Sequence, residues 1–285
     1  MSLLQGKNFR GMEMIESSIR HAAVAGAFYP DDEMELREMI EDYLSKAEEV
    51  KLKSRGKAKL RALIVPHAGY IYSGPIAAYG YKLLANYKEQ VKDVIVIGPS
   101  HYAGFRGACE AGFDIWETPL GRVKSESIKN KLNASAKQML ASYPQAHLPE
   151  HSIEVQLPFL QTVLGNEFVF HPILCGDVSP LSLVNAIEDA VNDETILIVS
   201  SDLSHYLTYD NAVKTDKVAN ASIPKLDMER FESRGDACGK TPILVLMHLA
   251  KKKGWKGKLL NYRNSGDTAG DKIRVVGYGC YAFYE

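Results

Sequence analysis

Apolar positions along the chain fall into two kinds of pattern. Continuous runs rich in β-branched residues predict buried strands over 60–65, 91–97, 168–174, 195–200 and 274–283. Apolar residues spaced by three and four positions predict helices over 31–47, 73–86, 153–163, 181–192 and 241–252. Buried strands that alternate with amphipathic helices indicate an α/β fold, with a central and mainly parallel sheet flanked by helices.

Some features modify this simple picture. Antiparallel pairing is expected within 105–123 and at the C-terminal run, and Pro75 is expected near the first turn of its helix, where a missing N–H costs little. The sequence shows no repeat, low-complexity tract or flexible linker, so we expect residues 20–285 to form a single domain. Residues 1–19 are interpreted as a tag remnant or a disordered extension.

Composition narrows the class of protein. Hydrophobic residues make up 46% and charged residues 24% of the 285 residues, which is typical of a globular protein. Lys and Arg total 34 against 35 Asp and Glu, so we expect no nucleic-acid partner and no anionic membrane partner. The start lacks the apolar core of a signal peptide, and the four cysteines form no CxxC pair. These features favour a cytoplasmic protein without a disulfide framework.

Three predicted strands are each followed closely by a histidine. His67 follows the strand over 60–65, His101 follows the strand over 91–97, and His205 follows the strand over 195–200. Because ligands bind beyond the carboxyl ends of parallel strands, we expect these side chains to share one cleft. Histidine is both a common metal ligand and the usual acid–base group near neutral pH. The pattern therefore predicts a metal or acid–base centre, with Asp202 beside it.

Two other residues are candidates for the same cleft. His151 directly precedes the predicted helix over 153–163, so we expect it at the rim of the cleft as a further catalytic candidate. Cys238 lies in a glycine-bracketed turn that opens another predicted helix. A helix start and a neighbouring cation favour the thiolate, which is the form that binds metals. His171, inside an apolar run, is interpreted as packing on its strand.

Several sequence blocks together resemble the Memo family, over a range from about Arg20 to the C-terminus. These blocks are 25–30 (AGAFYP), 65–70 (VPHAGY), 97–101 (IGPSH), 150–158 (EHSIEVQLP), 200–205 (SSDLSH), 238–239 (CG) and 264–267 (NSGD). Because they occur in the same order as in the family, the resemblance is far more specific than any single motif.

This resemblance implies a fold similar to that of the class III extradiol ring-cleaving dioxygenases, which hold non-haem Fe(II) with two histidines and a glutamate. His67 and His101 correspond to the paired histidines, and Cys238 falls where the dioxygenases place the carboxylate. His205 resembles the nearby acid–base residue, with Asp202 as its neighbour. The resemblance makes Fe(II) the first expectation, and a thiolate, which softens the ligand set, adds copper or zinc as alternatives.

The resemblance leaves three functions open. The first is a redox enzyme or dioxygenase-like protein that uses iron or copper on a small molecule. The second is a non-catalytic protein that binds a peptide or a protein partner in the same cleft. The third is a zinc hydrolase with an activated water. The metal content of the purified protein distinguishes these three functions, because the first predicts iron or copper, the second predicts no metal and the third predicts zinc.

Overall fold

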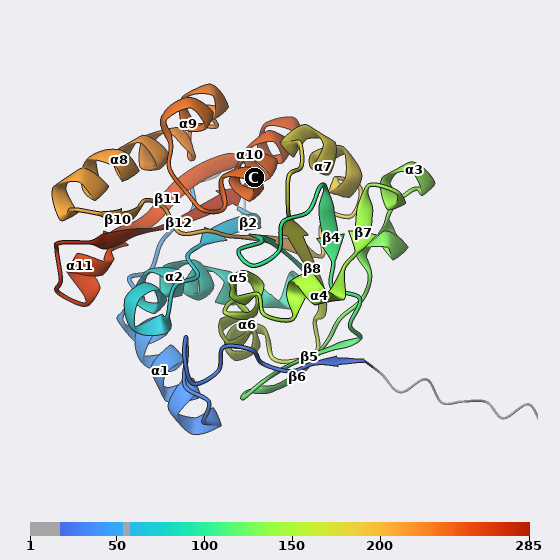
Figure 1. The fold of residues 1–285 in the computed structure, drawn as a ribbon, viewed down its shortest axis with the longest axis horizontal. Helices are drawn as coiled ribbons and strands as arrows, with labels where there is room; N and C mark the ends of the chain where they lie inside the picture. Colours follow the sequence, from blue (N-terminus) through green and yellow to red (C-terminus); the bar gives the residue numbers. More distant parts are fainter. Residues whose placement is uncertain (1–17, 54–57) are drawn as a thin grey trace, which may run out of the picture.

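A nine-stranded mixed sheet runs through the described part of the computed structural model, residues 18–53 and 58–285 (Figure 1). Its strand order is β10-β12-β2-β9-β3-β8-β4-β7, and β11 also pairs with β12. Four strands at its centre are parallel neighbours: β2 (Leu60–Val65), β9 (Thr195–Ser200), β3 (Asp93–Pro99) and β8 (Val169–Cys175). The predicted strands and the mainly parallel centre are therefore confirmed.

The outer strands make the sheet mixed. On one side, β12 (Val275–Tyr284) runs antiparallel to β2, β10 (His205–Leu207) and β11 (Lys256–Asn264). On the other side, β4 (Ala108–Glu110) is antiparallel to β8 and parallel to β7 (Leu140–Ser142). Antiparallel pairing occurs in both regions where the sequence predicts it. A second, three-stranded sheet contains β1 (Ile19–Arg20), β5 (Ile115–Thr118) and β6 (Gly121–Lys124).

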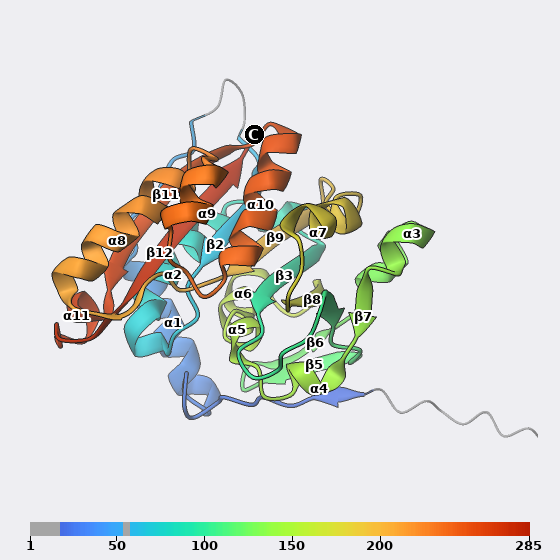
Figure 2. The same ribbon diagram turned by 45° about the horizontal axis from the view of Figure 1, so that its top comes forward.

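Helices cover both faces of the large sheet (Figures 1 and 2). One face carries α1 (Glu33–Lys46), α2 (Tyr70–Ala85), α5 (His151–Glu154) and α6 (Leu157–Leu164). The other face carries α7 (Pro180–Ile187), α8 (Tyr209–Ser222), α9 (Met228–Arg234) and α10 (Lys240–Lys253). Alternate residues of β2 enter the two cores, because successive side chains of a strand point to opposite faces. The shorter elements are η1 (Lys88–Gln90), η2 (Ile128–Lys131), α3 (Ala134–Lys137), α4 (Pro144–His147) and α11 (Ser265–Thr268).

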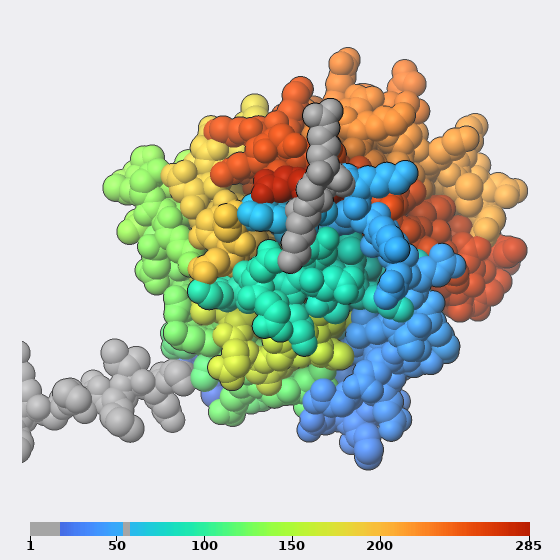
Figure 3. All heavy atoms as spheres, turned by 180° about the vertical axis from the view of Figure 1, so that it is seen from behind, coloured from blue at the N-terminus to red at the C-terminus, as the bar shows by residue number. Residues whose placement is uncertain are grey.

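Segments that are far apart in sequence meet on the first of these faces. Figure 3 shows blue α1, the teal end of α2 and yellow-green α6 side by side when the molecule is seen from behind. Helix α1 starts at the N-cap Asp32, whose side chain accepts hydrogen bonds from the backbone of Met34 and Glu35. Its buried residues Leu36 and Ile40 are four positions apart, as an amphipathic helix requires.

Two helix predictions need correction. Helix α2 begins at Tyr70 rather than at residue 73, because the Tyr70 N–H donates to the Phe28 carbonyl and the turn closes three residues earlier. Pro75 therefore lies inside the helix rather than near its first turn. The single helix predicted over 153–163 is two helices, α5 and α6, with Pro158 in the first turn of the second. Proline has no N–H with which to continue the preceding turn.

Two further expectations concern the N-terminal segment and membrane-spanning helices. Of the segment 1–19 that is interpreted as a tag or extension, residues 1–17 lie outside the described residues. Ile19 belongs to β1 and pairs with Ile115 of β5. Among the residues described, no helix is both long and apolar enough to cross a membrane.

The buried side chain of His171 is held by two acceptors, which confirms that it packs on its strand. Its Nδ1 lies 2.9 Å from the Glu126 carbonyl and its Nε2 lies 2.9 Å from Asp93 Oδ1. Lys131 Nζ contacts the other oxygen of Asp93 at 3.0 Å. Burial opposes ionisation of Asp93, but the hydrogen bonds from His171 and Lys131 outweigh it and hold the pKa of this carboxyl below its usual value.

Asp93→Asn should therefore have a pH-dependent effect on stability. Because the folded pKa is depressed, the ionised carboxylate stabilises the protein fully above its unfolded pKa of about 3.9, and this contribution is lost as the pH falls through the folded pKa. We expect a loss of roughly 1–2 kcal/mol in the free energy of unfolding at pH 7. Urea unfolding at pH 7 and pH 3 should show a smaller loss at the lower pH. Equal losses at both pH values would contradict the assignment.

Candidate metal centre

His67 follows β2 directly after Pro66, and its ring is held in one orientation. Its backbone N–H donates to Asp202 Oδ1 at 2.8 Å, and its Nδ1 lies 2.9 Å from Ser200 Oγ. The Ser200 hydroxyl donates its single hydrogen to the Ser152 carbonyl, so Ser200 Oγ must accept from the Nδ1–H of His67. The lone pair of His67 is therefore on Nε2, the atom that faces the site.

His101 is oriented by a carboxylate. Glu150 Oε2 accepts the backbone N–H of His101 at 2.6 Å, and Glu150 Oε1 lies 2.9 Å from His101 Nδ1. Burial opposes ionisation of Glu150, but the hydrogen bonds from His101 and from the backbone of Ser152 lower its pKa to about 2. An ionised carboxylate only accepts hydrogen bonds, so Nδ1 of His101 carries a proton and Nε2 is the ring nitrogen left to contact a ligand.

His151 is brought to the same place by a close contact between α5 and β3. A Cβ atom on Gly98 would lie 2.7 Å from Ser152 Oγ, so only glycine lets the helix approach the strand this closely. Ser152 Oγ then donates to the Pro99 carbonyl at 2.8 Å. Within the described residues, the buried Nδ1 of His151 has no hydrogen-bond partner, although Glu150 Oε1 lies 3.4 Å away.

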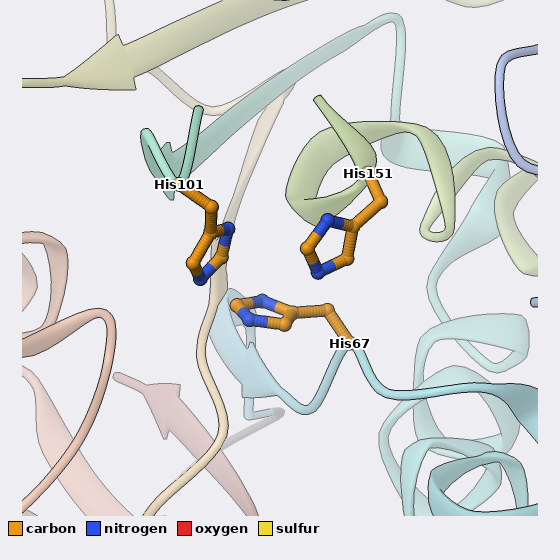
Figure 4. Close-up of side chains that lie close together, drawn as sticks. All are labelled: His67, His101 and His151. Carbon is orange, nitrogen blue, oxygen red and sulfur yellow. The ribbon is translucent and has the colours of Figure 1, made fainter. Parts of the chain in front are cut away.

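The three histidine rings converge on one point, as Figure 4 shows. One nitrogen from each of His67, His101 and His151 lies within 4.8 Å of the other two. Burial and the neighbouring histidine His101 lower the pKa of His67 to about 3, and burial together with His67 lowers the pKa of His151 to about 4. Both rings are therefore neutral at pH 7, which is the form that binds a metal. Three imidazoles that converge on one point form a ligand set suited to a transition metal ion.

Cys238 lies against the same histidine cluster. Its Sγ is 3.1 Å from His67 Nε2. A Cβ atom on Gly239 would lie 2.6 Å from Ser201 Cβ, and the Gly239 N–H donates to Ser201 Oγ, so the turn is docked closely on the strand end. Although Cys238 is only partly covered from solvent, burial raises the pKa of its thiol to about 12. Burial therefore opposes the thiolate that the helix start favours, and in the metal-free protein the thiol form predominates.

A cavity of 730 Å³ opens beside the three histidines, and both acid–base candidates line it. Asp202 is buried, and burial raises its pKa despite the hydrogen bond from His67. His205 is half-buried on the cavity wall. Cys238 lines a separate cavity of 410 Å³. The histidines therefore line one cavity and Cys238 lines the other.

The structure brings together every residue that the sequence nominates for the site, but it groups them differently. His151, expected at the rim, lies in the histidine cluster with His67 and His101. The division into ligands and acid–base residues stays a prediction. Sequence reasoning gave no role to Glu150 and Gln156, although both lie in the block 150–158. Gln156 donates to Ser200 Oγ at 2.7 Å and thereby helps to fix the acceptor that orients His67.

Comparison with known proteins places the chain in a family. The family model for Memo-like proteins matches residues 20–282. A MEMO1 family protein of Thermoplasma volcanium is 38% identical over 269 residues, which cover 91% of this chain and 96% of the relative. MEMO1 family proteins of Ignicoccus hospitalis and Nitrosopumilus maritimus are 38% and 35% identical; the matches cover 93% of this chain in both cases, and 98% and 99% of those proteins. Since these matches span nearly the whole chain, the protein belongs to the Memo-like family.

Proposed function

We propose that the protein is a metal-dependent redox enzyme of the dioxygenase-like kind that acts on a small molecule in the 730 Å³ cavity. The observation that carries this proposal is the fixed tautomer of two histidines. Ser200 and Glu150 accept from Nδ1 of His67 and His101, so Nε2 is the atom that each ring offers to a metal, in a cluster that His151 completes. The α/β arrangement, with the site at the carboxyl ends of parallel strands, also supports a fold like that of the class III extradiol dioxygenases.

The donors suit a redox-active metal. His67 and His101 are the first two ligands, and Cys238 and His151 are the neighbouring donors that complete the set. Nitrogen and sulfur ligands fit Fe(II), copper or zinc, and we propose Fe(II) as the physiological ion. When bound, the ion supplies Lewis acidity and one-electron chemistry.

The residues around the cluster have separate tasks. His205 lies on the cavity wall and moves a proton to or from the substrate, and Asp202 is the second proton acceptor there. Glu150 keeps the His101 ring in place, as carboxylates behind metal-bound histidines do. Phe28, Tyr72 and Tyr102 give the cavity an aromatic lining against which a planar substrate can pack.

Metal analysis of protein purified without a chelating column tests this proposal. Iron or copper near one equivalent supports the redox enzyme. Zinc near one equivalent indicates a hydrolase with an activated water, and absence of metal indicates a protein that binds a peptide in the cleft. Oxygen uptake with candidate small molecules then tests turnover of the iron or copper form.

Metal binding should also release one proton if Cys238 is a ligand. The raised pKa of Cys238, about 12, keeps it a thiol in the metal-free protein, whereas His67 and His151 have no proton to lose at pH 7. The dissociation constant for Zn(II) should therefore fall about tenfold for each pH unit between pH 7 and pH 8.5. Cys238→Ser should abolish this slope. A flat profile in the unchanged protein would leave the cysteine outside the ligand set.

A further inference from the structure

Arg274 is an exposed cation on the cavity wall that forms no salt bridge within the described residues. It lies directly before β12, whose first residue is at the sheet edge that carries the histidines, and it lines the 730 Å³ cavity. The described chain provides no carboxylate within 4.0 Å of its guanidinium and no hydrogen bond to it. Among the described residues its aromatic partner is the ring of Tyr206, whose centroid lies 5.0 Å from the guanidinium carbon.

The backbone at Tyr206 departs from regular strand geometry, and this departure turns the Tyr206 ring toward Arg274. Tyr206 has φ of 58°, a left-handed conformation that is uncommon for residues other than glycine. The register of β10 against β12 also shifts between His205 and Leu207. Successive strand residues normally point to opposite faces, but here His205 and Tyr206 both line the cavity. Strained backbone of this kind gathers at functional sites.

The charged residues around the cavity indicate which net charge an anion bound by Arg274 would carry. A guanidinium stacked on an aromatic ring keeps its N–H groups free for a carboxylate, which it binds through two parallel hydrogen bonds. Asp271 lines the same cavity, and its Oδ1 accepts the Ile273 N–H at 2.9 Å. Asp202 lines the cavity as well, and with two carboxylates among the described lining residues a doubly charged ligand is repelled more than a singly charged one.

We infer that Arg274 is a specificity-determining residue that binds the carboxylate of a small aromatic substrate in this cavity. The ring of the substrate lies against the aromatic wall that contains Tyr206, and its remaining part reaches toward the histidine cluster. This inference rests on the proposed function, since it takes the cavity to be the substrate site, but it does not require the metal to be present.

Fluorine NMR titration measures the preference directly. The probes are para-fluorobenzoate, its neutral analogue para-fluorobenzamide and the dianionic para-fluorophenyl phosphate, each added to metal-free and to Zn(II)-loaded protein. We expect the benzoate to bind about tenfold more tightly than the benzamide in both forms, because a charge-assisted pair with Arg274 is formed only with the benzoate. Arg274→Gln should reduce this preference to less than about twofold, and Arg274→Lys should retain part of it.

Lys272→Gln is the matched control. It removes the same charge two positions away, from a side chain that lies over Tyr209 and does not line the cavity, so the preference for benzoate should survive. No binding of benzoate by the unchanged protein, or an equal loss in both glutamine variants, overturns the inference. Tighter binding of the phosphate overturns the assignment of a singly charged group. If the protein prefers benzoate only when Zn(II) is bound, and Arg274→Gln keeps that preference, the carboxylate binds the metal rather than Arg274. Failure of the protein to bind any metal would refute the proposed function but not this inference.

Discussion

His101→Ala should lower the affinity of the protein for Co(II) or Zn(II) about 100- to 1000-fold, because one ligand of a four-ligand site contributes roughly a quarter of its binding free energy. His67→Ala should have an effect of the same size. The Nδ1 atoms of these two rings are engaged by Glu150 and Ser200, so Nε2 is the atom that each ring can offer to a metal. Competition against a chromophoric chelator measures the affinity.

Two variants in the same cleft provide the matched comparison. His205→Ala should keep the metal affinity within a few-fold and abolish turnover, because its proposed task is proton transfer. Glu150→Gln should weaken metal binding about 10- to 100-fold, the usual effect of removing the carboxylate behind a metal-bound histidine. If His205→Ala loses metal as completely as His101→Ala, then His205 belongs among the ligands and its acid–base role is wrong.

The positions of His67 and His101 could be predicted because they depend on features that are local in sequence. Each histidine lies two residues beyond its strand, β2 ending at Val65 and β3 ending at Pro99. Both strands are parallel to β9 and adjacent to it, so their carboxyl ends are close in space. Continuous apolar runs identify such strands, and the strand-end rule then brings the two histidines together.

The place of His151 could not be predicted in the same way. It depends on how closely α5 packs on β3, which in turn depends on the absence of a side chain at Gly98 and on the bond from Ser152 to Pro99. These are contacts between segments some 50 residues apart, as the separation of 53 positions between Ser152 and Pro99 shows. The state of Cys238 is likewise a matter of burial in the folded protein, which sequence context alone does not give.

A buried ion pair holds the segment that carries Glu150 and His151. Arg20 and Glu154 form a salt bridge in which both side chains are fully buried. The Arg20 guanidinium also donates to the carbonyls of His147 and Glu150 at 2.9 Å, and it lies 4.3 Å from the Trp116 ring centroid. The Arg20 side chain thus ties β1 to the backbone next to the metal centre.

Arg20→Met should lower the free energy of unfolding by about 3–5 kcal/mol, because it leaves Glu154 as a buried charge without its cation. The hydrogen bonds from the Ala23 and Val24 backbone and from Tyr29 would still reach Glu154, but none of these donors carries a positive charge. Urea unfolding at pH 7 measures the loss.

The control for this variant is an exposed ion pair of the same protein. Lys46→Ala removes the surface pair of Lys46 with Asp42 and should change the free energy of unfolding by no more than about 0.5 kcal/mol. If Arg20→Met costs as little as Lys46→Ala, the buried pair does not stabilise the fold. Loss of metal affinity in Arg20→Met under conditions where the protein stays folded would show that the pair also positions the metal centre, since the carbonyl of Glu150 is one of the groups that Arg20 holds.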